Sequence, residues 1–149
     1  MNILEVIDLD KIGDIVKGVL PKTQQASQPT TVQVLQPLAP PLSKTQDFHT
    51  GHNGVDLGAG ADKKVYAPEA GTVTVGFEAG GAGNYVTVDA GERVHKLFHL
   101  SKVTVKSGEQ VKQGQPVGYV GSTGKSTGNH LHWEVWIGKQ PVNPMQFVK

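Results

Sequence analysis

The chain has 149 residues, with 14 Lys and Arg against 13 Asp and Glu, and 37% of its residues are hydrophobic. This composition is typical of a globular protein with one modest core, and the near-zero net charge gives no indication of a nucleic-acid partner. The chain has no cysteine, which excludes disulfides, cysteine nucleophiles and Cys-type zinc sites, so any metal ion must be bound by His, Asp or Glu.

Residues 1–20 are predicted to form a short amphipathic helix that docks onto a partner or onto another copy of the chain. Asp10 is a suitable N-cap and Pro21 would end the helix. An arm packed on its own domain is the alternative. Acidic residues interrupt this segment, so we expect neither a secretory signal nor a transmembrane segment. One apolar stripe follows helical spacing: Ile12, Ile15, Val16, Val19 and Leu20.

Residues 21–44 are predicted to be a linker. The segment is rich in Gln, Pro, Thr and Ser and contains no acidic residue. Such a composition is typical of an extended, semi-rigid tether without a packed core of its own.

Residues 45–149 are predicted to form a mainly β domain. Short runs of β-branched and aromatic residues alternate with Gly-rich turns, and no segment has convincing helical periodicity. The runs that predict strands are 65–67, 71–77, 84–90, 93–100, 117–121 and 130–137.

The run 130–137, His-Leu-His-Trp-Glu-Val-Trp-Ile, places two histidines on one strand. Side chains at i and i+2 share a face, so His130, His132, Glu134 and Trp136 are expected on the face opposite Leu131 and its neighbours. The preceding Gly121–Ser126 has the wrong spacing for a phosphate-binding loop, and a strand follows it where such a loop opens a helix. Residues 121–128 are therefore expected to form a flexible groove wall.

A second pair of candidate ligands lies in the segment DFHTGHNGVDLGAG, residues 47–60, where Gly51 and Gly54 leave the backbone free to bend. His52 is followed four residues later by Asp56, and the two side chains can reach one small cation. One imidazole from the His-Leu-His strand would complete a set of two histidines and one aspartate. The fourth tetrahedral position would then be open for water, as in catalytic zinc sites.

Three segments, GHNGVDL, LFHLSKV and VKQGQPVGYVGSTGKSTGNHLHWEV, occur in an order and at separations that resemble the lysostaphin-like zinc endopeptidases of peptidoglycan. The resemblance covers about residues 47–147 and implies a compact antiparallel β domain of the lysostaphin-like, duplicated hybrid motif type. It implies that one zinc ion is bound by His52, Asp56 and His132. It also implies that His99 and His130 face the bound water and the scissile carbonyl, without indicating which of them is the base.

The remaining candidates have weaker patterns. Glu134 lies on the expected metal face and is predicted to orient a ligand imidazole or to be structural. Asn84 and Tyr85 match a family stretch near the groove and are predicted substrate contacts. His95 is four residues before His99, shares its face by strict alternation and is predicted to be a polar surface residue. His49 is expected beside the entrance to the site.

The sequence therefore predicts a zinc endopeptidase that cleaves bacterial peptidoglycan. The alternative is a non-catalytic wall-binding or virion structural module of the same fold. Because no secretory signal is expected, we predict a bacteriophage product. It would be a virion-associated lysin of the tail, attached or self-associated through residues 1–20, or an endolysin released to the wall at lysis.

Overall fold

The computed structural model describes residues 33–149. The predicted helix at 1–20 and the predicted linker residues 21–32 lie outside this part of the chain. Within residues 33–149 no helix is long and apolar enough to cross a membrane. The elements are β1 (Ser43–Gln46), β2 (Gly54–Gly58), β3 (Lys64–Tyr66), β4 (Gly71–Glu78), β5 (Gly83–Asp89), β6 (Val94–Val103), β7 (Gln110–Val111), β8 (Pro116–Val120), β9 (His130–Ile137), β10 (Gln140–Val142) and the 3-10 helix η1 (Pro144–Phe147).

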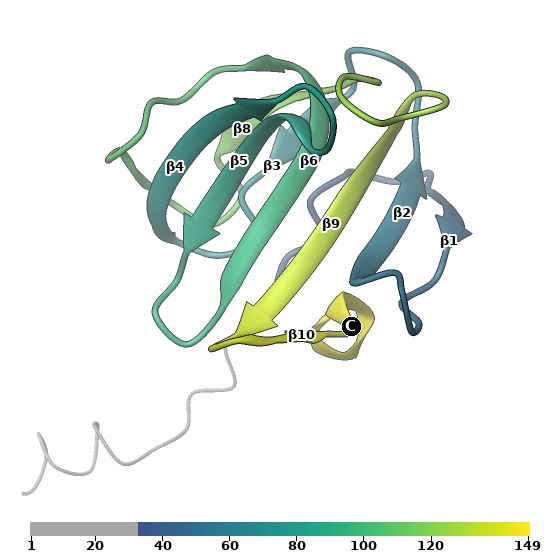
Figure 1. Ribbon diagram of the computed structural model, residues 1–149. Coiled ribbons are helices and arrows are strands. Elements are labelled where there is room, and N and C mark those ends of the chain that lie inside the picture. Colours follow the sequence, from purple (N-terminus) through teal and green to yellow (C-terminus); the bar gives the residue numbers. More distant parts are fainter. Residues whose placement is uncertain (1–32) are drawn as a thin grey trace, which may run out of the picture. The chain divides into compact units, whose positions relative to one another are not determined.

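The strands form an antiparallel sheet in the order β1-β2-β9-β6-β5-β4-β7, so the predicted mainly β antiparallel fold is confirmed. β10 pairs with β9, and β8 pairs with both β3 and β6. Long strands β4, β5, β6 and β9 lie side by side, and β2 continues the sheet beyond β9 (Figure 1). This arrangement places β9 between β2 and β6, the two strands that carry further candidate residues.

β9 has the two faces that its alternation predicts. Leu131, Trp133 and Val135 are fully buried in the core. His130 and His132 are half-buried on the opposite face. The core side of β9 is therefore hydrophobic, and its other side presents the imidazoles to a groove.

Residues 33–44, the end of the predicted 21–44 linker, pack against the β domain. Val34 and Leu38 are each 1% exposed and belong to the main hydrophobic cluster. Backbone hydrogen bonds reinforce this packing, because the Leu35 N–H donates to the Pro68 carbonyl and the Tyr66 N–H to the Pro37 carbonyl. The compact unit begins at Gln33.

β6 contains a bulge at His99, where the backbone adopts a left-handed conformation with φ of 65°. The pairing of β6 with β5 shifts register at the same place, and the His99 N–H donates to the Ala82 carbonyl rather than continuing the ladder. A bulge of this kind re-aims the side chain at which it occurs. If the alternation of side chains continued unbroken from His95, His99 would point into the core. The bulge instead turns the His99 side chain to the opposite face.

The prediction that His95 is a polar surface residue is wrong, since His95 is fully buried. Its Nε2–H donates to Glu69 Oε2 at 2.6 Å, and its Nδ1 accepts the Trp133 Nε1–H at 3.3 Å. Glu69 also receives two hydrogen bonds of 2.8 Å from the guanidinium of Arg93. The prediction failed because the bulge separates His95 from His99 and puts them on opposite faces.

Candidate metal centre

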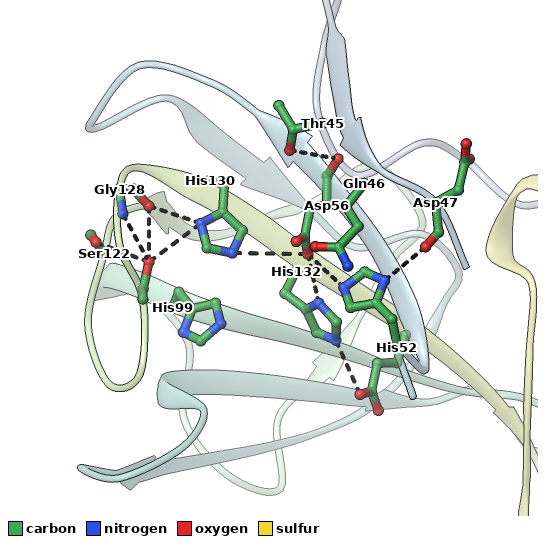
Figure 2. A network of polar contacts seen from close by, with 12 residues as sticks. Thr45, Gln46, Asp47, His52, Asp56, His99, Ser122, Gly128, His130 and His132 are labelled. Atoms are coloured by element: carbon green, nitrogen blue, oxygen red, sulfur yellow. Dashed lines mark hydrogen bonds and ion pairs between the residues drawn. The ribbon is translucent and has the colours of Figure 1, made fainter. Parts of the chain in front are cut away.

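The three predicted ligands come together on one face of the sheet (Figure 2). Asp56 of β2 pairs directly with His132 of β9, and antiparallel partners share a face. His52 comes from a tight turn before β2, closed by backbone hydrogen bonds with His49. His132 Nδ1 lies 2.7 Å and His52 Nε2 lies 3.2 Å from Asp56 Oδ1. One candidate ligand atom from each side chain lies within 4.8 Å of the others.

Hydrogen bonds to the far side of both ligand imidazoles fix their orientation. His52 Nδ1–H donates to the Asp47 carbonyl at 2.9 Å, which leaves Nε2 directed at the cluster. His132 Nε2–H donates to Glu134 Oε1 at 3.1 Å, which directs Nδ1 at the cluster. Outer carboxylates and carbonyls hold metal-binding imidazoles in this way in known metal sites. The contact predicted between Glu134 and a ligand imidazole is thus present in the structure.

The charges of the cluster are strongly coupled. Burial would raise the pKa of Asp56, but the hydrogen bond from His132 and the nearby imidazoles hold it below its usual value. Burial would lower the pKa of His132, but hydrogen bonds to Asp56 and Glu134 raise it to about 9. The cluster thus holds a carboxylate between imidazoles, an arrangement that favours the protonated form of His132.

His99 and His130 lie beside the cluster, with their ring centroids 4.9 Å apart. His99 Nδ1–H donates to the Thr123 carbonyl at 2.8 Å, and His130 Nδ1–H donates to the Gly128 carbonyl at 2.8 Å. Within residues 33–149 neither Nε2 makes a hydrogen bond, although His130 Nε2 lies 3.9 Å from Asp56 Oδ1. Burial lowers the pKa of His99, which favours the neutral ring.

The loop 121–128 supplies both of these carbonyls and is itself anchored. The Thr123 hydroxyl donates its hydrogen to the Leu100 carbonyl, and its oxygen accepts a hydrogen bond from the Asn84 N–H. At Gly124, with φ of 72°, a Cβ would lie only 2.2 Å from the Gly83 nitrogen, so the close approach of the two segments requires glycine there. The predicted groove wall thus also orients the two free imidazoles.

A groove of about 740 Å³ runs over the cluster. Its lining includes all five predicted metal and catalytic residues. Gln46, Glu78, Phe98 and residues 124–127 form much of the remaining lining. An extended peptide lying in this groove would pass over both the ligand cluster and the free imidazoles.

Other sequence candidates lie around this groove. Asn84 and Tyr85 are not among the residues that line it. The Asn84 amide donates to the Leu100 carbonyl at 3.0 Å, and Tyr85 packs edge-on against Phe98. Their predicted substrate contacts stay predictions. His49 stacks on His52 with 5.4 Å between ring centroids and is not among the residues that line the groove, so its predicted place beside the entrance stays a prediction.

Two histidines and one aspartate, with two further imidazoles beside them, define a candidate metallohydrolase site on one face of an antiparallel sheet. Residues 50–144 match the model of peptidase family M23, and the chain belongs to this family. The sequence resemblance to the lysostaphin-like peptidases is confirmed at the family level.

Individual relatives agree with this assignment. The chain is 40% identical over 96 residues to the peptidoglycan DD-endopeptidase ShyA of Vibrio cholerae, covering 64% of this chain and 22% of that protein. It is similar in structure to a zinc-containing peptidase from Vibrio cholerae, with TM-score 0.67, 33% identity, and 71% and 37% of the two chains covered. The antimicrobial peptidase lysostaphin from Staphylococcus simulans gives TM-score 0.67, 32% identity, and 72% and 49% coverage. The chain spans about a fifth of the length of the curated relatives it matches.

Proposed function

We propose that the chain is a zinc-dependent endopeptidase that hydrolyses peptide bonds of bacterial peptidoglycan. The observation that carries the proposal is the convergence of His52, Asp56 and His132 beside His99 and His130, whose Nδ1–H groups are held by backbone carbonyls. A peptidoglycan DD-endopeptidase and a zinc-containing peptidase among the relatives support the substrate class and the metal.

The donor set fits zinc. Two imidazole nitrogens and one carboxylate oxygen are ligands that zinc accepts in tetrahedral catalytic sites, where the fourth position is kept for water. A zinc ion bound there would lower the pKa of that water to about 7 and polarise the scissile carbonyl.

His99 and His130 supply the proton transfers. Their Nδ1–H groups are held by backbone carbonyls, so either Nε2 can take a proton from the attacking water. The resulting Nε2–H can donate to the oxygen that gains negative charge or return the proton to the leaving amine. Glu134 orients His132 from behind.

The test separates metal binding from catalysis. Asp56→Ala and His132→Ala should lose both zinc and cleavage of purified peptidoglycan. His99→Ala should retain stoichiometric zinc and lose about 10²–10⁴-fold in turnover, because only a proton-transfer group is removed. Glu92→Ala, at a side chain that is 89% exposed and does not line the groove, is the control and should retain both properties. Wild-type turnover by the His99 variant would refute the proposed mechanism.

The same measurements test the alternative, a non-catalytic wall-binding or virion module. Such a module would bind walls without releasing new peptide termini, whether or not zinc is present. Mass spectrometry of digested walls would also identify which bond is cut. A phage tail lysin or endolysin role, and self-association through residues 1–20, stay predictions. Locating the protein in purified virions would test the tail role.

A further inference from the structure

β9 continues beyond His132 with two more residues of the same face, Glu134 and Trp136. Glu134 is 8% exposed, and both of its carboxylate oxygens are engaged. Oε1 accepts the His132 Nε2–H at 3.1 Å, and Oε2 accepts the Trp136 indole N–H at 2.5 Å. A line of contacts therefore runs along β9 from the indole to the imidazole.

The indole is itself fixed from the neighbouring strand. Lys96 of β6 pairs with Glu134 across the ladder, and its Nζ lies 4.2 Å from the centroid of the Trp136 ring. A cation over the face of an indole is attracted by the ring quadrupole. Trp136 is half-buried, so this contact and the hydrogen bond together define where its ring lies.

Orienting Glu134 matters because a carboxylate has several rotamers and only some of them reach His132. One hydrogen bond to each oxygen, from His132 to Oε1 and from Trp136 to Oε2, holds the Glu134 carboxylate in place. A carboxylate that accepts from the far nitrogen of a ligand imidazole fixes its tautomer and makes it a better ligand.

We propose that Trp136 is a positioning residue of the metal centre, which acts through Glu134 to hold the His132 imidazole in its metal-binding orientation. The proposal rests on the proposed function only in taking zinc as the ion. The indole N–H has no other hydrogen-bond acceptor within residues 33–149. Its contribution should therefore depend on the carboxylate.

The experiment measures zinc affinity of the full-length protein by competition with a chromogenic chelator. Trp136→Phe keeps an aromatic ring under Lys96 and removes the N–H. It should weaken zinc binding about tenfold, the lower end of the range for outer partners of metal ligands. Glu134→Gln should weaken it by about 10–100-fold. Ile137→Ala, on the same strand but pointing to the other face, is the control and should leave the affinity unchanged.

The double variant distinguishes positioning from simple packing. If Trp136 acts through Glu134, adding Trp136→Phe to Glu134→Gln should cause less than about twofold further loss, because coupled residues are not additive. The proposal would be overturned if the two losses of zinc affinity multiplied in the double variant. It would also be overturned if the zinc affinity of Trp136→Phe lay within about twofold of wild type. A wild-type protein that binds zinc without cleaving walls would refute the endopeptidase and leave the role of Trp136 standing. A wild-type protein without zinc affinity would refute both.

Discussion

Replacing Arg93 by methionine should destabilise the β domain. In the wild type, Arg93 Nε and Nη2 each donate to Glu69 at 2.8 Å, and the side chains of Glu69 and Arg93 are 5% and 14% exposed. Methionine keeps most of the aliphatic stem and removes the guanidinium. Glu69 then remains buried with only His95 as a donor.

The expected loss is about 3 kcal/mol in the free energy of unfolding. Each charge-assisted hydrogen bond contributes roughly 1.5–3 kcal/mol, and breaking a buried ion pair by removing one partner costs about 3–5 kcal/mol. We use the lower end of the range for a broken ion pair because the Arg93 side chain is partly exposed and Glu69 keeps its hydrogen bond from His95. For a chain of this length the melting temperature should fall by roughly 6–12 °C.

Urea denaturation of the metal-free protein, followed by tryptophan fluorescence from the buried Trp133 and the half-buried Trp136, measures this loss. Metal must be removed, because a ligand that binds only the folded state adds its own stability. Glu69→Gln combined with Arg93→Met removes both charges and should recover more than half of the loss. An Arg93→Met variant within about 0.5 kcal/mol of wild type would show that the Glu69–Arg93 pair is not a buried ion pair in solution.

Three further predictions concern other parts of the structure. Leu38→Ala should cost about 2–5 kcal/mol in chemical denaturation because Leu38 is 1% exposed, whereas exposed Leu35 should tolerate alanine; equal effects would argue that this segment is not packed. The folded-state pKa values of His95 and Glu69 are both lowered, so the stability they contribute is complete above about pH 6.5. It should fall as the pH drops, first through His95 and then, below about pH 4.5, through Glu69. Because the raised pKa of His132 changes the stability in the opposite sense, an NMR titration of His95 itself is the test, and a folded-state pKa of His95 at or above about 6.5 would contradict this burial. Thr123→Val removes the hydroxyl that anchors the groove wall and should lower turnover about tenfold or more while zinc content is unchanged, and Thr123→Ser should retain activity.

Much of the fold was predictable because its signals are local. The alternation in 130–137 predicted which side of β9 faces the core, since strand geometry has a period of two. The spacing of His52 and Asp56 indicated that both side chains could reach one ion. In the structure His52 Nε2 lies 3.2 Å from Asp56 Oδ1. That Asp56 and His132 would bind the same ion was implied by the family resemblance alone, and the strand pairing that brings them together was not predicted.

What the sequence did not predict depends on contacts between distant segments. Nothing in the run Val94–Val103 indicates a bulge, because histidine is an ordinary strand residue and the left-handed backbone at His99 arises from its bond to Ala82. The burial of Val34 could not be read from a Pro- and Gln-rich composition, although the apolar residues Val34 and Leu38 were the available signal. The carbonyls that orient His99 and His130 belong to the backbone, where sequence patterns carry no signal.

His99 is required for the proposed chemistry, but its left-handed backbone conformation lowers the stability of the fold. A residue other than glycine costs about 1–2 kcal/mol in this conformation, since its Cβ crowds the following carbonyl. Glycine at position 99 would relieve that cost and remove the imidazole at the same time. That change would also remove the hydrogen bond to the Thr123 carbonyl, so the proposed activity retains a histidine whose backbone conformation the fold tolerates only at a cost. Stabilising this domain for use should begin at positions far from the bulge, such as its exposed turns.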